Sequence, residues 1–180
     1  MTLVEVMVAV AISSILLTMA GSLWLFGSRS FAAMGNYTDL DARSRNALDL
    51  MSRDIREATG VTGFNNQTTT KSLTITNTAQ NTGATYLWRA STQTLVCQKP
   101  GQPDQVYLTG CDNWSFELFQ RVPQKGTNYV FFPATNKAGA TDLSVCKLIN
   151  MSWKCSRTIL GSKVNTESVQ TAQVMLRNKQ

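Results

Sequence analysis

Hydrophobic and polar positions divide the chain into an apolar segment, an amphipathic segment and a region of short alternating runs. The first run covers residues 6–28, which are 23 consecutive positions without a charged side chain. At 1.5 Å per residue, this run makes a helix of about 34 Å, close to the ~30 Å hydrocarbon core of a bilayer. We therefore predict a transmembrane helix over residues 1–28.

The helix is expected to continue beyond the apolar run. From Arg29 onward polar residues predominate, and an apolar stripe recurs at steps of three and four, as on one face of a helix. The stripe consists of Leu40, Ala47, Leu48, Met51 and Ile55. Asp41 precedes Arg45 by four residues, which supports a helix, and Gly60 and Gly63 provide a stop signal. The pattern predicts a helix over about 2–59, with residues 29–60 as its amphipathic half.

Short runs of β-branched and aromatic residues separated by turn residues follow Gly63, which indicates strands. The expected strands cover 72–76, 85–89, 94–97, 105–109, 113–119, 129–132 and 168–176. In 113–119, Trp114, Phe116 and Leu118 share one face, which needs an apolar partner such as the helix stripe. The fold class predicted is α+β: one long N-terminal helix packed against an antiparallel sheet formed by a headgroup, residues 61–180.

Charge is unevenly distributed between the helix and the headgroup. Residues 1–60 hold five Arg and six acids, whereas residues 61–180 hold twelve Lys or Arg and five acids. The basic residues are scattered, so solubility is the simpler explanation, and contact with DNA or an anionic surface is the alternative. Trp153 lies among Lys147, Lys154 and Arg157, where it would stack on a nucleobase or, more simply, shield a sheet edge.

The inventory of reactive residues argues against an enzyme. The chain has no His, the commonest general base and metal ligand, and no CxxC pair that would indicate zinc. We expect no catalytic residue, metal or cofactor. The four cysteines, Cys97, Cys111, Cys146 and Cys155, predict two disulfides in an exported chain. Three connectivities are open; we favour the local pairs Cys97–Cys111 and Cys146–Cys155, with residues 147–154 in the loop that the second pair closes.

Glu5 is the residue in the apolar segment that requires an explanation. The positive end of the helix dipole favours an acid in the first turn, but this offsets only a fraction of the cost of a carboxylate in or near lipid. A secretory signal peptide does not fit either, because it has a basic start and a small-residue cleavage site. Glu5 is therefore expected to have a positively charged partner.

At this point the chain resembles a known family. The stretch MTLVEVMVAVAISSILL is similar to the mature N-terminus of type IV pilins and type II secretion pseudopilins: a hydrophobic residue, a small polar one, Leu, a hydrophobic residue and Glu. These positions are Met1, Thr2, Leu3, Val4 and Glu5 here. The stretches NALDLMSRDIREATG (46–60) and VQTAQVMLRNKQ (169–180) resemble J-type pseudopilins and similar minor pilins. The family more often has Phe at the position of Met1, and many major pilins have Pro at that of Ser22.

The resemblance implies a life cycle and a set of partners. A prepilin peptidase would expose Met1, which would be N-methylated. The chain would sit in the inner membrane with its headgroup outside the cytoplasm, and then join a helical filament with copies of itself and other pilin-like subunits, either an extracellular pilus or a periplasmic pseudopilus. Glu5 would pair with the amine of a neighbour's Met1, and Thr2 and Leu3 would belong to the same assembly segment. The alternatives are a minor pseudopilin that primes secretion filaments near the tip, and a minor pilin that binds DNA or surfaces.

Overall fold

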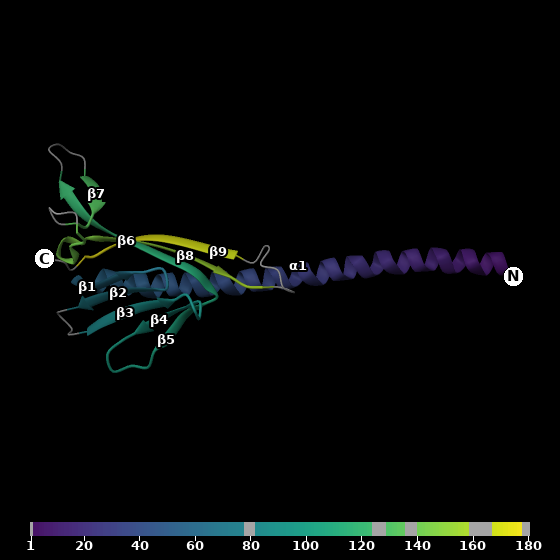
Figure 1. Cartoon of the computed structure of the whole chain (residues 1–180), viewed down its shortest axis with the longest axis horizontal. Coiled ribbons are helices and arrows are strands. Elements are labelled where there is room, and N and C mark those ends of the chain that lie inside the picture. The colour runs from purple at the N-terminus through teal and green to yellow at the C-terminus, as the bar shows by residue number, and fades with distance from the viewer. Residues whose placement is uncertain (1, 78–81, 124–128, 136–139, 159–166, 178–180) are drawn as a thin grey trace.

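The protein consists of a long helix with a headgroup of strands at its far end (Figure 1). The computed structural model describes residues 2–77, 82–123, 129–135, 140–158 and 167–177. Helix α1 spans Leu3–Glu57, and its N-terminal half projects alone from the headgroup. The predicted α+β class, with one long N-terminal helix packed on antiparallel strands, is confirmed.

Helix α1 is continuous across the junction between its apolar and amphipathic halves. Its 55 residues correspond to about 82 Å. Thr2 is the N-cap, and the chain turns to extended backbone at Ala58, so the predicted bounds of about 2–59 were close. Gly27 and Gly35 lie inside the helix without interrupting it.

The strands form two antiparallel sheets, where the sequence predicted a single one. The first sheet has the order β1-β2-β3-β4-β5 and the second the order β7-β6-β8-β9. The first contains β1 (Gly60–Asn66), β2 (Thr70–Asn77), β3 (Thr82–Arg89), β4 (Thr94–Gln98) and β5 (Gln105–Thr109). The second contains β6 (Cys111–Pro123), β7 (Tyr129–Pro133), β8 (Leu148–Ser156) and β9 (Glu167–Met175), and a short 3-10 turn, η1 (Leu143–Val145), precedes β8.

Two strands were not predicted. The expectation that residues 147–154 form a loop closed by a disulfide is wrong, because they belong to β8, which pairs with both β6 and β9. The signal was present: Ile149, Met151 and Trp153 alternate with polar residues and are all buried. Strand β1 was not predicted because Gly60 and Gly63, which it contains, are typical of the end of a helix and of turns.

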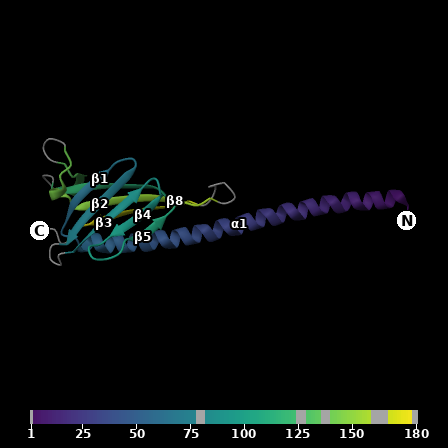
Figure 2. The same cartoon turned by 60° about the horizontal axis from the view of Figure 1, so that its bottom comes forward.

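The core lies where the two sheets meet α1. Phe64 of β1 packs edge-on against Phe116 of β6, with ring centroids 5.1 Å apart, which joins the sheets. Helix α1 runs along the side of the headgroup and contacts β5, β8 and β9 (Figure 2). From the helix, Leu40, Ala47, Met51 and Ile55 are each at most 2% exposed. This buried stripe is the one predicted, except that Leu48 is only partly buried.

Two methionines of α1 provide a test of this packing. Met51 is fully buried, whereas Met34 is 67% exposed. Met51→Ala is expected to lower the free energy of unfolding by about 2–5 kcal/mol, because it leaves a cavity between helix and sheets. Denaturant unfolding of the detergent-solubilised chain measures the loss. Met34→Ala is the control and is expected to change it little; equal losses in the two variants would contradict the packing.

Candidate functional site

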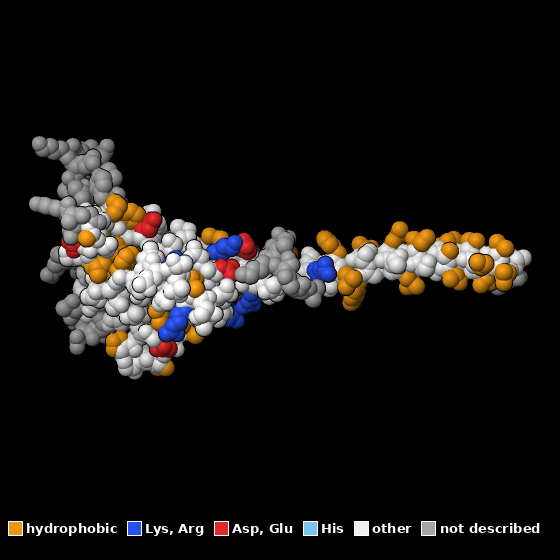
Figure 3. Space-filling model, viewed as in Figure 1, with side chains coloured by type: hydrophobic (Ala, Val, Ile, Leu, Met, Phe, Trp, Pro, Cys, Tyr) orange, Lys and Arg blue, Asp and Glu red, His pale blue; other side chains and the backbone are white. Residues whose placement is uncertain are grey.

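The most distinctive surface of the molecule is the apolar half of α1 (Figure 3). Among the described residues, 21 large hydrophobic side chains are exposed, and all but Val106, Val169 and Met175 lie on α1 between Leu3 and Tyr37. They surround the helix on all sides, so no single partner face in the headgroup accounts for them. A helix that is hydrophobic all round is normally covered by lipid or by other helices. Here the helix is long and apolar enough to cross a membrane.

Three hydroxyl groups in this segment are bonded within the helix itself. Ser14 donates to the carbonyl of Ala11 at 2.8 Å, and Ser22 donates to the carbonyl of Met19 at 2.8 Å. Thr18 donates to the carbonyl of Ile15 at 2.8 Å in the same way. In lipid or a dry helix bundle every polar group must be satisfied internally. These hydroxyls therefore place no unmet hydrogen-bond demand on the environment.

Glu5 belongs to a capping box at the start of α1. The Thr2 backbone N–H donates to Oε2 of Glu5 at 2.7 Å, and the Glu5 N–H donates to the Thr2 hydroxyl at 3.4 Å. This role was not predicted, although Thr-x-x-Glu before an apolar run is the known signature of a capping box. A carboxylate has about four lone-pair sites, so the cap leaves room for a cation. Met1 lies outside the described residues.

Aspartates of α1 hold the headgroup at two levels. At the base, Oδ2 of Asp39 lies 2.5 Å from Nη2 of Arg157, just beyond β8, and Asp41 accepts from the side chain of Gln170 in β9 at 3.0 Å. The hydrogen bond from Arg157, reinforced by Arg43, lowers the pKa of Asp39 below its ordinary value. The basal end of the headgroup is thus joined to α1 by charge as well as by packing.

At the other end of the headgroup the anchor is Asp54. Its Oδ2 accepts from Lys99 at 2.7 Å and from the hydroxyl of Tyr86 at 3.0 Å, and its side chain is 11% exposed. Burial raises the pKa of Tyr86, so the hydroxyl stays protonated as a donor. Asp54 therefore connects the last turn of the helix to β3 and the turn after β4.

Several of the scattered basic side chains are used within the protein. Besides Lys99 and Arg157, Lys154 pairs with Glu167 at 2.7 Å, and Lys71 donates to the carbonyl of Trp114 at 2.5 Å. The alternative in which Trp153 stacks on a nucleobase is wrong, because Trp153 is 2% exposed in the core. It does not shield a sheet edge either, since β8 is an inner strand of its sheet.

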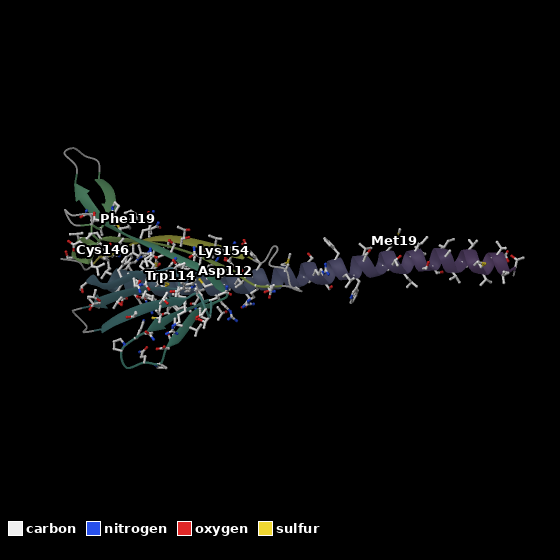
Figure 4. All side chains as sticks on the ribbon, in the orientation of Figure 1. Met19, Asp112, Trp114, Phe119, Cys146 and Lys154 are labelled. Atoms are coloured by element: carbon white, nitrogen blue, oxygen red, sulfur yellow. The ribbon has the colours of Figure 1, made fainter. Side chains whose placement is uncertain are left out.

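The cysteines are buried thiols, and the local pairs expected from the sequence do not fit the geometry. Cys146 precedes β8 and Cys155 is near its end, so the extended strand separates them by more than ~20 Å, against a Cα–Cα limit of about 7 Å for a disulfide. Figure 4 accordingly shows Cys146 far from Lys154, the neighbour of Cys155. Cys111 bonds through its N–H to Gln93, so strand residues 94–97 place Cys97 some 10 Å or more away.

The chemistry available in the described residues is limited. They contain no group of three or more Cys, Asp or Glu side chains that could hold a metal ion. A hollow of about 370 Å³ at the end of α1 is lined by Arg53, Asp54 and Lys99, among others, but Asp54 is already paired with Lys99. That the chain is not an enzyme stays a prediction.

Comparison with protein-family models, with curated proteins and with solved structures found no match in any of the three. What the protein does is therefore inferred from its own residues and their geometry. Three features bear on function: the exposed apolar half of α1, the carboxylate at the start of that half, and the headgroup that is fixed to the other half.

The joint between Asp39 and Arg157 predicts a pH dependence. Because the folded-state pKa of Asp39 is depressed, its stabilising effect is present above the ordinary value of 3.8 and is lost as the pH falls through the lower folded value. The wild type is expected to have a higher Tm than Asp39→Asn at pH ~6, and this difference in Tm should disappear in strong acid. Thermal melts across pH measure it, with Asp49→Asn on the exposed helix face as the charge-matched control. A gap of constant size down to pH ~2 would rule out this origin.

Proposed function

We propose that the protein is a pilin-like structural subunit that polymerises through the N-terminal half of α1 into a type IV pilus or a related filament. The observation that carries the proposal is the exposed apolar surface of α1, which projects beyond the headgroup as one continuous helix. A bilayer would cover this surface before assembly, with the headgroup outside the cytoplasm, and neighbouring helices would cover it afterwards. The resemblance of residues 1–5 to pilin N-termini supports the same role.

Glu5 distinguishes this role from that of a plain membrane anchor. A capping box is equally well made by Gln, so capping alone does not require a charged residue within an apolar surface. An ionised carboxylate there is costly unless it meets a cation. The terminal amine of a neighbouring subunit's Met1 meets this need, and two opposite charges attract strongly in a low-dielectric helical core. The pair would also fix the register between subunits.

The observations favour a structural role over a binding role. Trp153, for which stacking on a nucleobase was the alternative to a structural role, is buried. Four basic residues have partners within the protein: Lys71, Lys99, Lys154 and Arg157. Counting this chain per unit length of purified filament distinguishes the main repeating subunit of a filament from a minor pseudopilin near its tip.

Replacing Glu5 by Gln separates charge pairing from capping. Gln accepts the hydrogen bond from the Thr2 N–H as Glu does, but it has no charge for an amine. We expect Glu5→Gln to leave the chain in the membrane fraction. Its amount in sheared filaments should fall at least about tenfold, because the neighbour's terminal amine is left as an unpaired buried charge, which costs several kcal/mol. Quantitative immunoblotting of both fractions measures the effect.

Thr2→Ala is the matched control for this experiment. It removes the capping hydroxyl and leaves the carboxylate, so it is expected to cost about 1 kcal/mol of helix stability and to reduce incorporation far less than Glu5→Gln. Wild-type incorporation of Glu5→Gln, or an equal loss in both variants, would mean that Glu5 only caps the helix and would overturn the pairing.

The processing step gives an independent prediction. If a prepilin peptidase and its methylase act on the chain, protein purified from filaments begins at Met1 and carries one methyl group on the amine. Mass spectrometry of the N-terminal peptide tests this directly. An unmodified terminus, or extra residues before Met1, would contradict the pilin-type maturation.

A further inference from the structure

Two of the four cysteines, Cys111 and Cys155, lie directly opposite each other. They are register partners at the end of the antiparallel β6–β8 pair, where β6 begins and β8 is about to end. Both residues are fully buried, and the Cys111 thiol donates to the carbonyl of Asn113 at 3.4 Å. Cys97 lies in the other sheet beside Tyr107, and Cys146 donates to the carbonyl of Leu148 at 3.7 Å.

The backbone at this point favours a short distance between the two side chains. The N–H of Ser156 donates to the carbonyl of Gly110 at 2.8 Å, one step beyond the cysteine pair. Hydrogen-bonded and non-hydrogen-bonded positions alternate along an antiparallel ladder, so the cysteines occupy a non-hydrogen-bonded position with Cα atoms ~4.5 Å apart. That spacing lies within the range of disulfides, about 4.4–6.8 Å.

Gly110 makes this approach feasible. Its φ is +67°, which other residues rarely adopt, and a Cβ there would lie 2.6 Å from the carbonyl oxygen of Ser156. Beyond the pair, the Ser156 hydroxyl bonds to the carboxylate of Asp112, and Trp88 in the first sheet donates to the carbonyl of Cys111 at 2.9 Å. The two strands are therefore held in this register independently of the sulfur atoms.

The two thiols lie within reach of each other in the folded headgroup. Contact with the opposite sulfur is the first cause of the pKa shift at each of them, and the buried Ser44 hydroxyl of α1 lies beside Cys155. The thiolate is the nucleophile in disulfide formation, and either cysteine can supply it before the headgroup closes.

We propose that Cys111 and Cys155 form the disulfide of this headgroup, made by exchange with a small-molecule or protein disulfide. One of the two cysteines, as its thiolate, attacks one sulfur of the oxidant and releases the other as a thiolate. The second cysteine then loses its proton, attacks the sulfur of the first and releases the second thiolate. Both cysteines are oxidised, and the oxidant disulfide is reduced to two thiols, which take up the two protons. Because both sulfur atoms are buried in the finished fold, exchange takes place before the headgroup closes.

The bond joins β6 and β8 at the point where Cys155 lies beside Ser44 of α1. It would close a loop of about 45 residues in the unfolded chain, and loops of this size give substantial stabilisation. The proposal rests on the proposed function only for its compartment, since an extracytoplasmic headgroup meets oxidants that keep disulfides intact.

Peptide mapping tests the pairing without any substitution. Full-length chain in detergent is reduced, unfolded, refolded with reduced and oxidised glutathione, and blocked with an alkylating agent. Digestion with trypsin and Asp-N puts each cysteine on its own peptide: 90–103, 104–111, 142–147 and 155–157. The expected main product is 104–111 linked to 155–157. Any other main linkage, or four alkylated peptides, would overturn the proposal.

Thermal melting provides a second readout. Reduction of the refolded chain is expected to lower its Tm by roughly 5–15 °C. This fall should persist in Cys97→Ser, which keeps the pair, and disappear in Cys111→Ser. A fall that persists in Cys111→Ser would contradict the pairing.

The same map, applied to chain alkylated directly in the cells that produce it, separates this proposal from the proposed function. The link in both samples supports the pairing together with an extracytoplasmic headgroup. The link only after refolding supports the pairing and contradicts that location, and with it the proposed life cycle. Neither result depends on whether filaments form.

Discussion

The unbroken backbone of α1 is the constraint on which the rest of the structure depends. One helix must satisfy two different surroundings, since its first half exposes apolar side chains on every side and its second half buries a single stripe under two sheets. No loop or hinge separates the halves in the described residues. The position of the headgroup is therefore fixed relative to the apolar segment, and any packing of that segment also arranges the headgroups.

Charge complementarity within the chain follows from the same design. The acidic helix and the basic headgroup look unbalanced when each is considered alone, and the basic part suggests an external anionic partner. In the fold, Asp39 and Asp54 of the helix each accept a cation from the headgroup. Part of the charge difference between helix and headgroup is thus neutralised by ion pairs inside the molecule. These pairs cannot be predicted from the sequence, because the partners are far apart along the chain.

Features with a local signal were predictable, and features that depend on long-range pairing were not. The helix bounds and the stripe around Met51 followed from periodicity and stop signals, and seven strands followed from their composition. The predictions of a single sheet and of local disulfides failed because both depend on tertiary structure: the division into two sheets and the register of β6 against β8. Strand β8 and the Thr2–Glu5 cap were different: their signals, alternation and Thr-x-x-Glu, were present in the sequence and were overlooked.

The internally bonded hydroxyls of Ser14, Thr18 and Ser22 have a consequence for the energetics of transfer. These three hydroxyls are already satisfied by carbonyls of their own helix, so they would give up no hydrogen bond in a transfer from hydrocarbon to a bundle of similar helices, and they would gain none. As far as these groups are concerned, the two environments are nearly equivalent for the segment. The direction of such a transfer would then depend on other interactions, such as an ion pair or close packing at Ala and Gly.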